Sequence, residues 1–236
     1  MNVDKIIIIH YTPLVERKEY LQGWFHANRV RNFFFKADCD RENLTEDVIC
    51  NWATDAAKKR LDKGTMAVNI AWWQTIAEIA TGQDESVLVL EDDAIFCDDF
   101  LPRFNDAVKT LPEDFEIGWL VDGFGFKIKG EFLREDCVWY RAPRQNRTTG
   151  AVLLKKSAAQ KIIAAYPRFD IVVDAQITEI SHALHLGSYW MEPALITQGT
   201  QRGVYGSALR NFTFRFDDPL YAQVYTEEKT CFAPEE

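Results

Sequence analysis

The chain has 236 residues, a formal charge of −9 and an isoelectric point near 5.1. This net negative charge excludes a protein that binds nucleic acid or anionic lipid through an overall positive electrostatic field, so we expect no nucleic-acid partner. With 47% hydrophobic and 13% aromatic residues, the composition is that of a folded globular chain, and the length suits one α/β domain.

The N-terminal sequence and the cysteines indicate a cytoplasmic protein. No charged segment followed by an apolar one opens the chain, and no apolar run approaches the roughly 18 residues of a membrane span. The five cysteines are odd in number and include no C-x-x-C pair, so a zinc site is not expected. We therefore expect reduced thiols, no membrane span and a cytoplasmic location.

The first third of the chain is predicted to alternate between strands and helices. Four consecutive isoleucines, residues 6–9, indicate a strand covered on both faces, because β-branched side chains favour buried strands. The helices show apolar residues at helical spacing. In chain order the expected elements are a strand within 5–13, a helix at 14–30, a short strand at 33–35, loops and a helix at 38–64, and a helix at 66–80.

The rest of the chain is predicted to continue this alternation and to end in a tail. Gly and polar residues at 81–86 stop the preceding helix and make a turn. We place one domain at residues 1–215 and an acidic tail at 216–236. The expected elements are a strand at 87–96, a helix at 98–112, a strand at 115–123, two strands around a polar loop between 138 and 154, a helix ended by Pro167, and a helix from Asp174 to Gly187.

Three carboxylates, Glu91, Asp92 and Asp93, end the apolar strand that begins at Val87. In an extended chain alternate side chains share a face, so Glu91 and Asp93 are predicted to point one way and Asp92 the other. Carboxylates this close raise one another's pKa unless a cation or hydrogen-bond donors compensate. At the carboxyl edge of an open α/β sheet they could hold Mg²⁺ or Mn²⁺ and, through it, a diphosphate. The alternative is an acidic turn before the next helix.

Several segments, in chain order from Lys5 to Ser207, resemble family 25 glycosyltransferases, the group of lipooligosaccharide β-galactosyltransferases and collagen galactosyltransferase domains. One segment departs from the family, because Asn69 stands near the position where a Ser-His pair is expected. The segments that carry the resemblance are IIIIHYTPLVER, GTMAVNIAWWQTI, VLVLEDDAIF, FEIGWLVDG, TTGAVLLKKSAAQKII, VDAQITEI and EPALITQGTQRGVYGS.

This resemblance implies a GT-A-like single α/β domain with a mostly parallel central sheet flanked by helices. It implies an inverting enzyme that uses Mn²⁺ or Mg²⁺ to move galactose or glucose from a UDP-sugar to a glycan or hydroxylated acceptor. Asp93 would be the metal ligand and Asp174 the catalytic base. The residues expected to bind the donor are Ile9, His10, Tyr11, Arg17, Glu91, Asp92, Asp122, Thr149 and Gly150.

Other interpretations remain open at this point. The protein could be a glycan-binding module without turnover, which is favoured if activity needs the missing Ser-His pair. It could be a sugar nucleotidyltransferase, although no Gly-rich phosphate loop follows the first strand and the first glycine is Gly23. Asp174 could instead be the N-cap of its helix, with Glu179 as the reserve base.

Two further groups of side chains have a functional and a structural interpretation. Arg141, Arg144 and Arg147 could bind phosphates bidentately, but we favour a solvated basic loop. Trp72 and Trp73 could stack on a sugar, although we expect one of them to fill the core.

Overall fold

The computed structural model describes residues 3–209 and 231–232, and its elements alternate along most of the chain. The strands are β1 (Lys5–Ile9), β2 (Phe33–Lys36), β3 (Ser86–Glu91), β4 (Ala94–Phe96), β5 (Ile117–Trp119), β6 (Lys127–Ile128), β7 (Trp139–Arg141), β8 (Ala151–Lys155), β9 (Ser188–Met191), β10 (Ile196–Gln198) and β11 (Cys231–Phe232). The helices are α1 (Val15–Ala27), α2 (Glu46–Trp52), α3 (Asp55–Arg60), α4 (Lys63–Thr81), α5 (Phe100–Lys109), α6 (Lys156–Ala165) and α7 (Val173–Ala183).

A central sheet of seven strands has the order β2-β1-β3-β8-β5-β9-β7. Pairing is parallel among β2, β1 and β3 and between β5 and β9, whereas β8 and β7 are antiparallel to their neighbours. Five of the seven strands therefore run in one direction. This confirms the prediction of an α/β chain with a mostly parallel central sheet.

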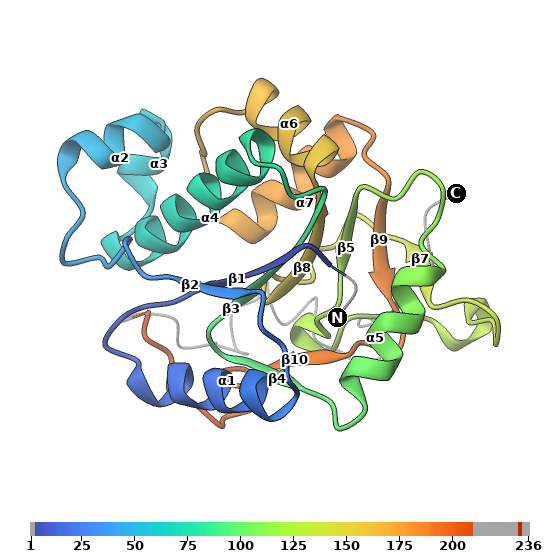
Figure 1. Ribbon diagram of the computed structural model, residues 1–236. Helices are drawn as coiled ribbons and strands as arrows, with labels where there is room; N and C mark the ends of the chain where they lie inside the picture. Colours follow the sequence, from blue (N-terminus) through green and yellow to red (C-terminus); the bar gives the residue numbers. More distant parts are fainter. Residues whose placement is uncertain (1–2, 210–230, 233–236) are drawn as a thin grey trace.

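Helices flank this sheet on both faces. Figure 1 shows α4, α6 and α7 together on one face, with α1 on the other, beside the ribbon of β4 and β10. The four isoleucines of β1 are buried, as expected for a strand covered on both sides. Trp72 and Trp73 of α4 are fully buried. Both rings belong to the core, so the hypothesis that one of them stacks on a sugar is wrong.

The chain from Ser86 to Phe96 does not form one continuous strand. It leaves the central sheet after Glu91, turns at Asp92 and Asp93, and continues as β4, which pairs with β10 in a separate antiparallel ribbon. The three carboxylates therefore lie where the chain passes from one sheet to the other.

The polar segment 38–64 contains two short helices, α2 and α3, where the sequence predicted one helix among loops. Thr45 caps the first through Val48 N–H, and Thr54 caps the second through Ala57 N–H, each at 3.3 Å. These successive caps explain the division, because a capping side chain fixes a non-helical residue at each start.

Most of the predicted acidic tail at 216–236, and the domain boundary at 215, lie outside the described residues. Of this segment the structure describes Cys231–Phe232, the short strand β11, which pairs in parallel with β6. Over residues 3–209, none of the helices combines the length and apolar character that a membrane crossing needs.

Arg147, expected in a solvated loop, is buried in an ion pair. Its Nη2 atom lies 2.7 Å from Glu192 Oε1, and the side chains are 1% and 9% exposed. Nη1 donates to the carbonyl oxygen of Met191 at 3.1 Å. The loop before β8 is thereby fixed to the end of β9. The solvated interpretation is wrong for Arg147, because a charge at this depth requires a partner.

We expect Glu192→Gln to destabilise the fold, because it leaves the buried Arg147 without a compensating charge. The loss should be about 3 kcal/mol in the free energy of unfolding, measured by urea denaturation. Asp106→Asn is the matched control, since the Asp106–Lys109 pair is exposed at 74% and 64%. It should change stability by less than about 1 kcal/mol. Equal effects of the two substitutions would contradict this account of the buried pair.

Candidate active site

The predicted site residues meet at one edge of the central sheet. Ile9, the last residue of β1, is in register with Glu91, the last residue of β3. The N–H of Glu91 donates to the carbonyl oxygen of Gly150 at 3.1 Å, directly before β8. This is the carboxyl edge of the parallel strands, where open α/β sheets bind ligands.

Asp92 is held by the two residues that follow β1 and by α1. Its Oδ1 accepts from Arg17 Nη1 at 2.7 Å. Its Oδ2 lies 2.9 Å from His10 Nδ1 and accepts from the N–H of Tyr11 at 3.1 Å. The structure thus brings four predicted donor-binding residues together, and both Asp92 oxygens contact these neighbours. Their contact with a nucleotide stays a prediction.

Glu91 faces the opposite way and meets neutral donors. It accepts from Thr149 Oγ1 at 2.7 Å and from Trp72 Nε1 at 3.3 Å. Gln198 Nε2 donates to its other oxygen at 3.0 Å. The carboxylate of Glu91 is therefore surrounded by α4, the loop before β8 and the end of β10.

Asp93 lies beside Glu91, and the segment after β10 encloses its carboxylate. Gln198 Nε2 donates to Oδ1 at 3.3 Å, and the N–H of Thr200 donates to Oδ2 at 3.3 Å. The Thr200 hydroxyl also donates to Oδ2. Gln198 touches both Glu91 and Asp93, whereas Asp92 faces away from it. This confirms the prediction that alternate carboxylates share a face.

Asp174 is the second residue of α7 and is not its N-cap, which is Val172. The start of α7 is held from another helix, because Asn69 of α4 accepts from the N–H of Val173 at 3.0 Å and donates to Ile171 O at 2.6 Å. The interpretation of Asp174 as the N-cap is therefore wrong. Its side chain accepts from the following N–H, of Ala175, at 2.8 Å.

Glu91, Asp93 and Asp174, here called the carboxylate cluster, share one electrostatic environment. Burial, followed by the charge of Asp93, raises the pKa of Glu91 to about 8, and Asp174 contributes to the rise. Burial also raises the pKa of Asp93 and of Asp174. Among the described residues no Lys, Arg or His forms an ion pair with these three carboxylates, in contrast to Asp92.

Asp122 and Gly150, two predicted donor-binding residues, have different surroundings. Asp122 accepts from Thr197 Oγ1 at 3.1 Å and pairs with Arg202. Successive strand residues point to opposite faces, so Asp122 contacts the face of β10 opposite to Gln198. Gly150 lies against Gln198, where an added Cβ would be 2.6 Å from its side chain.

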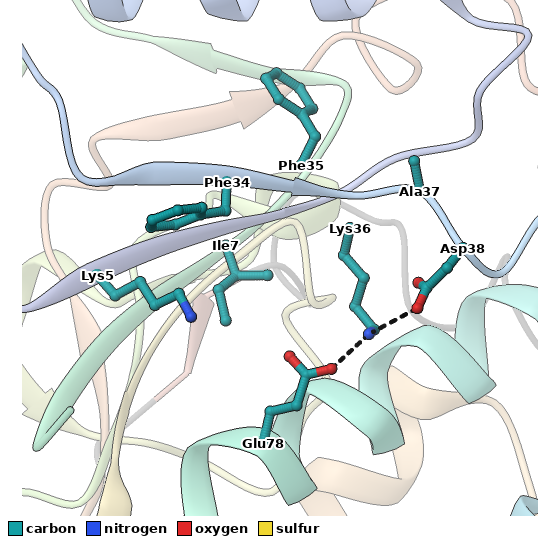
Figure 2. Close-up of a pocket in the computed structure, with 8 residues that line it drawn as sticks. All are labelled: Lys5, Ile7, Phe34, Phe35, Lys36, Ala37, Asp38 and Glu78. Carbon is teal, nitrogen blue, oxygen red and sulfur yellow. Dashed lines mark hydrogen bonds and ion pairs between the residues drawn. The ribbon is translucent and has the colours of Figure 1, made fainter. Parts of the chain in front are cut away.

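The groove in Figure 2 lies elsewhere, between the edge strand β2, β1 and α4, with a volume of about 350 Å³. Its Lys36 bridges Glu78 at 2.7 Å and Asp38 at 3.4 Å, so these three charges compensate one another. Glu179, the reserve base, is exposed and lines another cavity of about 210 Å³. None of the carboxylate cluster lines either cavity.

Two residues that contact the cluster, Gln198 and Thr200, were given no role from the sequence. Both lie in the segment EPALITQGTQRGVYGS, one of those that resemble family 25 glycosyltransferases. Gly199, between them, donates its N–H to the carbonyl oxygen of Asp93 at 2.7 Å. The sequence feature that could have indicated them is a polar residue on each side of a glycine at the end of a short strand. An ordinary turn has the same pattern, so it does not distinguish a site.

Comparisons with known proteins give no family assignment. No family model matches the chain, and no curated protein matches it. Forty chains of solved structures show a distant likeness, and three of them illustrate its range. The first is a glycosyltransferase involved in the glycosylation of the major capsid of PBCV-1, with 11% identity, a TM-score of 0.43, and coverage of 82% of this chain and 92% of that one.

The other two represent different enzyme classes. One is the galactosyltransferase LgtC in complex with donor and acceptor sugar analogs, with 14% identity, a TM-score of 0.40, and coverage of 98% of this chain and 84% of that one. The other is a glucose-1-phosphate thymidylyltransferase from Bacillus anthracis, with 14% identity, a TM-score of 0.36, and coverage of 83% and 71%. Likenesses at this level do not decide between sugar transfer and nucleotidyl transfer.

The raised pKa of Glu91 predicts a pH dependence of stability. Between pH 4.5, the usual pKa, and about 8, the folded state keeps a proton that the unfolded state releases. Wild-type stability should therefore fall as the pH rises through this window. Glu91→Gln removes this contribution. The free energy of unfolding of the variant, measured relative to that of wild type, should therefore increase with pH, by on the order of 3 kcal/mol from pH 5 to pH 8.

Urea denaturation at several pH values measures this difference. Glu179→Gln, which removes an exposed carboxylate of α7, is the control, and its curve should run parallel to that of wild type. A parallel curve for Glu91→Gln as well would show that Glu91 does not bind this proton.

Proposed function

We propose that this protein is a glycosyltransferase that moves a hexose, galactose or glucose, from a UDP-sugar to a glycan or hydroxylated acceptor. The observation that carries the proposal is the pair Glu91 and Asp93, two neighbouring carboxylates at the carboxyl edge of the sheet that meet only neutral hydrogen-bond donors among the described residues. Such a pair favours a bound cation, and a cation there favours a diphosphate.

Mn²⁺ or Mg²⁺ fits the atoms at this edge, because both ions prefer oxygen ligands. Asp93 is the proposed protein ligand, with Glu91 beside it. Among the described residues no group of three His, Cys, Asp or Glu side chains could hold a metal ion. This suits a site in which one or two carboxylates act together with substrate phosphates and water, as is common for Mg²⁺. The metal would offset the negative charge of the departing diphosphate.

Asp174 is the proposed base. Inversion by direct displacement needs a group that takes the proton of the acceptor hydroxyl on the sugar face opposite the diphosphate. Burial raises the pKa of Asp174, which makes its carboxylate a stronger proton acceptor. Asn69 fixes the first turn of α7, and Asn146 hydrogen bonds to Asp174. The proton leaves the hydroxyl as its oxygen bonds to the sugar and the bond from sugar to diphosphate breaks.

The donor is expected to lie along the ends of β1 and β3. Ile9, His10, Tyr11 and Arg17 are on one side of this position, and Thr149 and Gly150 are on the other. The ring of Tyr11 is partly exposed and lies under the guanidinium of Arg41, 4.5 Å from its centroid. We propose that these residues surround the nucleotide.

Release of UDP from UDP-sugars, with and without Mn²⁺, tests the proposed reaction. A glycosyltransferase releases UDP when acceptor is present and depends on the metal. A sugar nucleotidyltransferase would instead form pyrophosphate from a nucleoside triphosphate and a sugar phosphate. A glycan-binding module would bind sugar without releasing either product.

We expect Asp93→Asn to abolish metal-dependent binding of UDP and to abolish turnover. The variant loses the charge that attracts the cation, while an amide of the same size can still accept from Thr200. Calorimetry with UDP and Mn²⁺ measures the binding, and circular dichroism checks the fold. Undiminished metal-dependent UDP affinity in the folded variant would count against Asp93 as the ligand.

Asp174→Asn should separate binding from chemistry. The amide can still accept from Ala175 N–H but cannot take a proton, so UDP should bind with Mn²⁺ while transfer falls by about 10²–10⁴-fold. The rate of sugar transfer under saturating donor measures this loss. Near wild-type transfer by a normally melting variant would mean that the base lies elsewhere.

A further inference from the structure

We infer that Gln198 is a positioning residue of this site, whose neutral amide holds Glu91 and Asp93 side by side without supplying a compensating positive charge. The inference rests on the proposed function, because a carboxylate pair without a compensating positive charge favours a cation, whose binding displaces the proton that Glu91 holds. No role was assigned to Gln198 from the sequence, and it lies more than 100 residues from both carboxylates along the chain, at separations of 107 and 105.

The amide of Gln198 uses all of its hydrogen-bonding capacity at this position. Nε2 donates to Glu91 Oε2 at 3.0 Å and to Asp93 Oδ1 at 3.3 Å. Oε1 accepts from Thr148 Oγ1 at 2.7 Å and from Gln201 Nε2 at 2.6 Å. A side-chain amide has two N–H donors and two acceptor lone pairs. The reverse orientation would set the amide oxygen against two carboxylates, so the network fixes which end faces them.

The backbone around Gln198 leaves room for one placement of its side chain. Pairing of β10 with β4 sets Gln198 opposite Ala94, directly after Asp93, and Gln198 is only 6% exposed. On the other side lies Gly150, where an added Cβ would be 2.6 Å from Cγ and Cδ of Gln198. A glycine is required there because any side chain would displace the amide.

The neutrality of Gln198 distinguishes Glu91 and Asp93 from Asp92, the carboxylate between them in sequence, which has a cationic partner. Arg17 forms an ion pair with Asp92 at 2.7 Å and compensates its charge. A cationic residue between Glu91 and Asp93 would do the same and leave no attraction for a metal ion. An amide offsets the repulsion through hydrogen bonds and adds no positive charge that would repel a cation. Each carboxylate oxygen has two lone pairs, so Glu91 Oε2 and Asp93 Oδ1, which accept only from Gln198 among the described residues, each keep one for a cation.

Titration of Mn²⁺ into the full chain, first alone and then with UDP present, tests this inference, with free Mn²⁺ followed by its electron paramagnetic resonance signal. Gln198→Met keeps the length of the side chain and removes both N–H donors. It should raise the dissociation constant about tenfold or more, because hydrogen bonds to charged groups are the strong ones. Gln160→Met, a change of the same kind on the exposed face of α6, should bind Mn²⁺ like wild type.

A second variant tests the neutrality of the amide. Gln198→Lys sets an ammonium between the two carboxylates, so Mn²⁺ binding should be lost in a protein that still melts cooperatively. The rise in melting temperature on adding Mn²⁺ is recorded for every variant. A purely structural defect lowers the melting temperature with and without Mn²⁺ alike, whereas loss of positioning removes the rise.

The outcomes separate this inference from the proposed function. If wild type binds Mn²⁺ and Gln198→Met binds it with equal affinity, the role of Gln198 is overturned and the proposed metal site still stands. If the methionine variant does not fold, retention of Mn²⁺ binding by the lysine variant would overturn it instead. Wild type that binds no Mn²⁺, with or without UDP, would overturn both.

Discussion

The crowding of three successive carboxylates at the end of β3, with Asp92 and Asp93 buried and Glu91 half-buried, is the constraint on which the rest of the site depends. Neighbouring charges in a low-dielectric environment repel, and each needs a cation or hydrogen-bond donors to remain in place. The chain meets this need in two ways. Asp92 is compensated by Arg17 and His10, which fastens α1 and β1 to the edge of the sheet. Glu91 and Asp93 receive neutral donors and no compensating positive charge among the described residues.

One helix, α4, positions both the proposed metal site and the proposed base. Trp72 donates to Glu91, and Asn69, three residues earlier on the same helix, holds the start of α7 and so the position of Asp174. Residues three apart on a helix lie on one face, which lets a single rigid element align the proposed metal site and the proposed base. Asn69, which departs from the family 25 pattern, therefore has a defined structural role in this chain.

The sequence predicted those parts of the structure that depend on local patterns. The buried β1 and the shared face of Glu91 and Asp93, opposite to Asp92, follow from strand periodicity, which short segments reveal. Contacts between distant segments were not predictable in this way. Gln198 reaches Glu91 because β10 pairs with β4 outside the central sheet, and Arg147 is buried because Glu192 lies opposite it. In sequence Arg147 stands in a polar loop, so its composition alone indicated solvent.

The most direct test of the central claim is the position of a bound metal. Crystals grown with Mn²⁺ and UDP, measured near the manganese absorption edge, would locate the ion by its anomalous signal. The account predicts a peak beside the Asp93 carboxylate, at the carboxyl edge of β3, with Glu91 adjacent and the diphosphate on the open side. A peak at another part of the molecule, or UDP bound away from this edge without any metal, would contradict it.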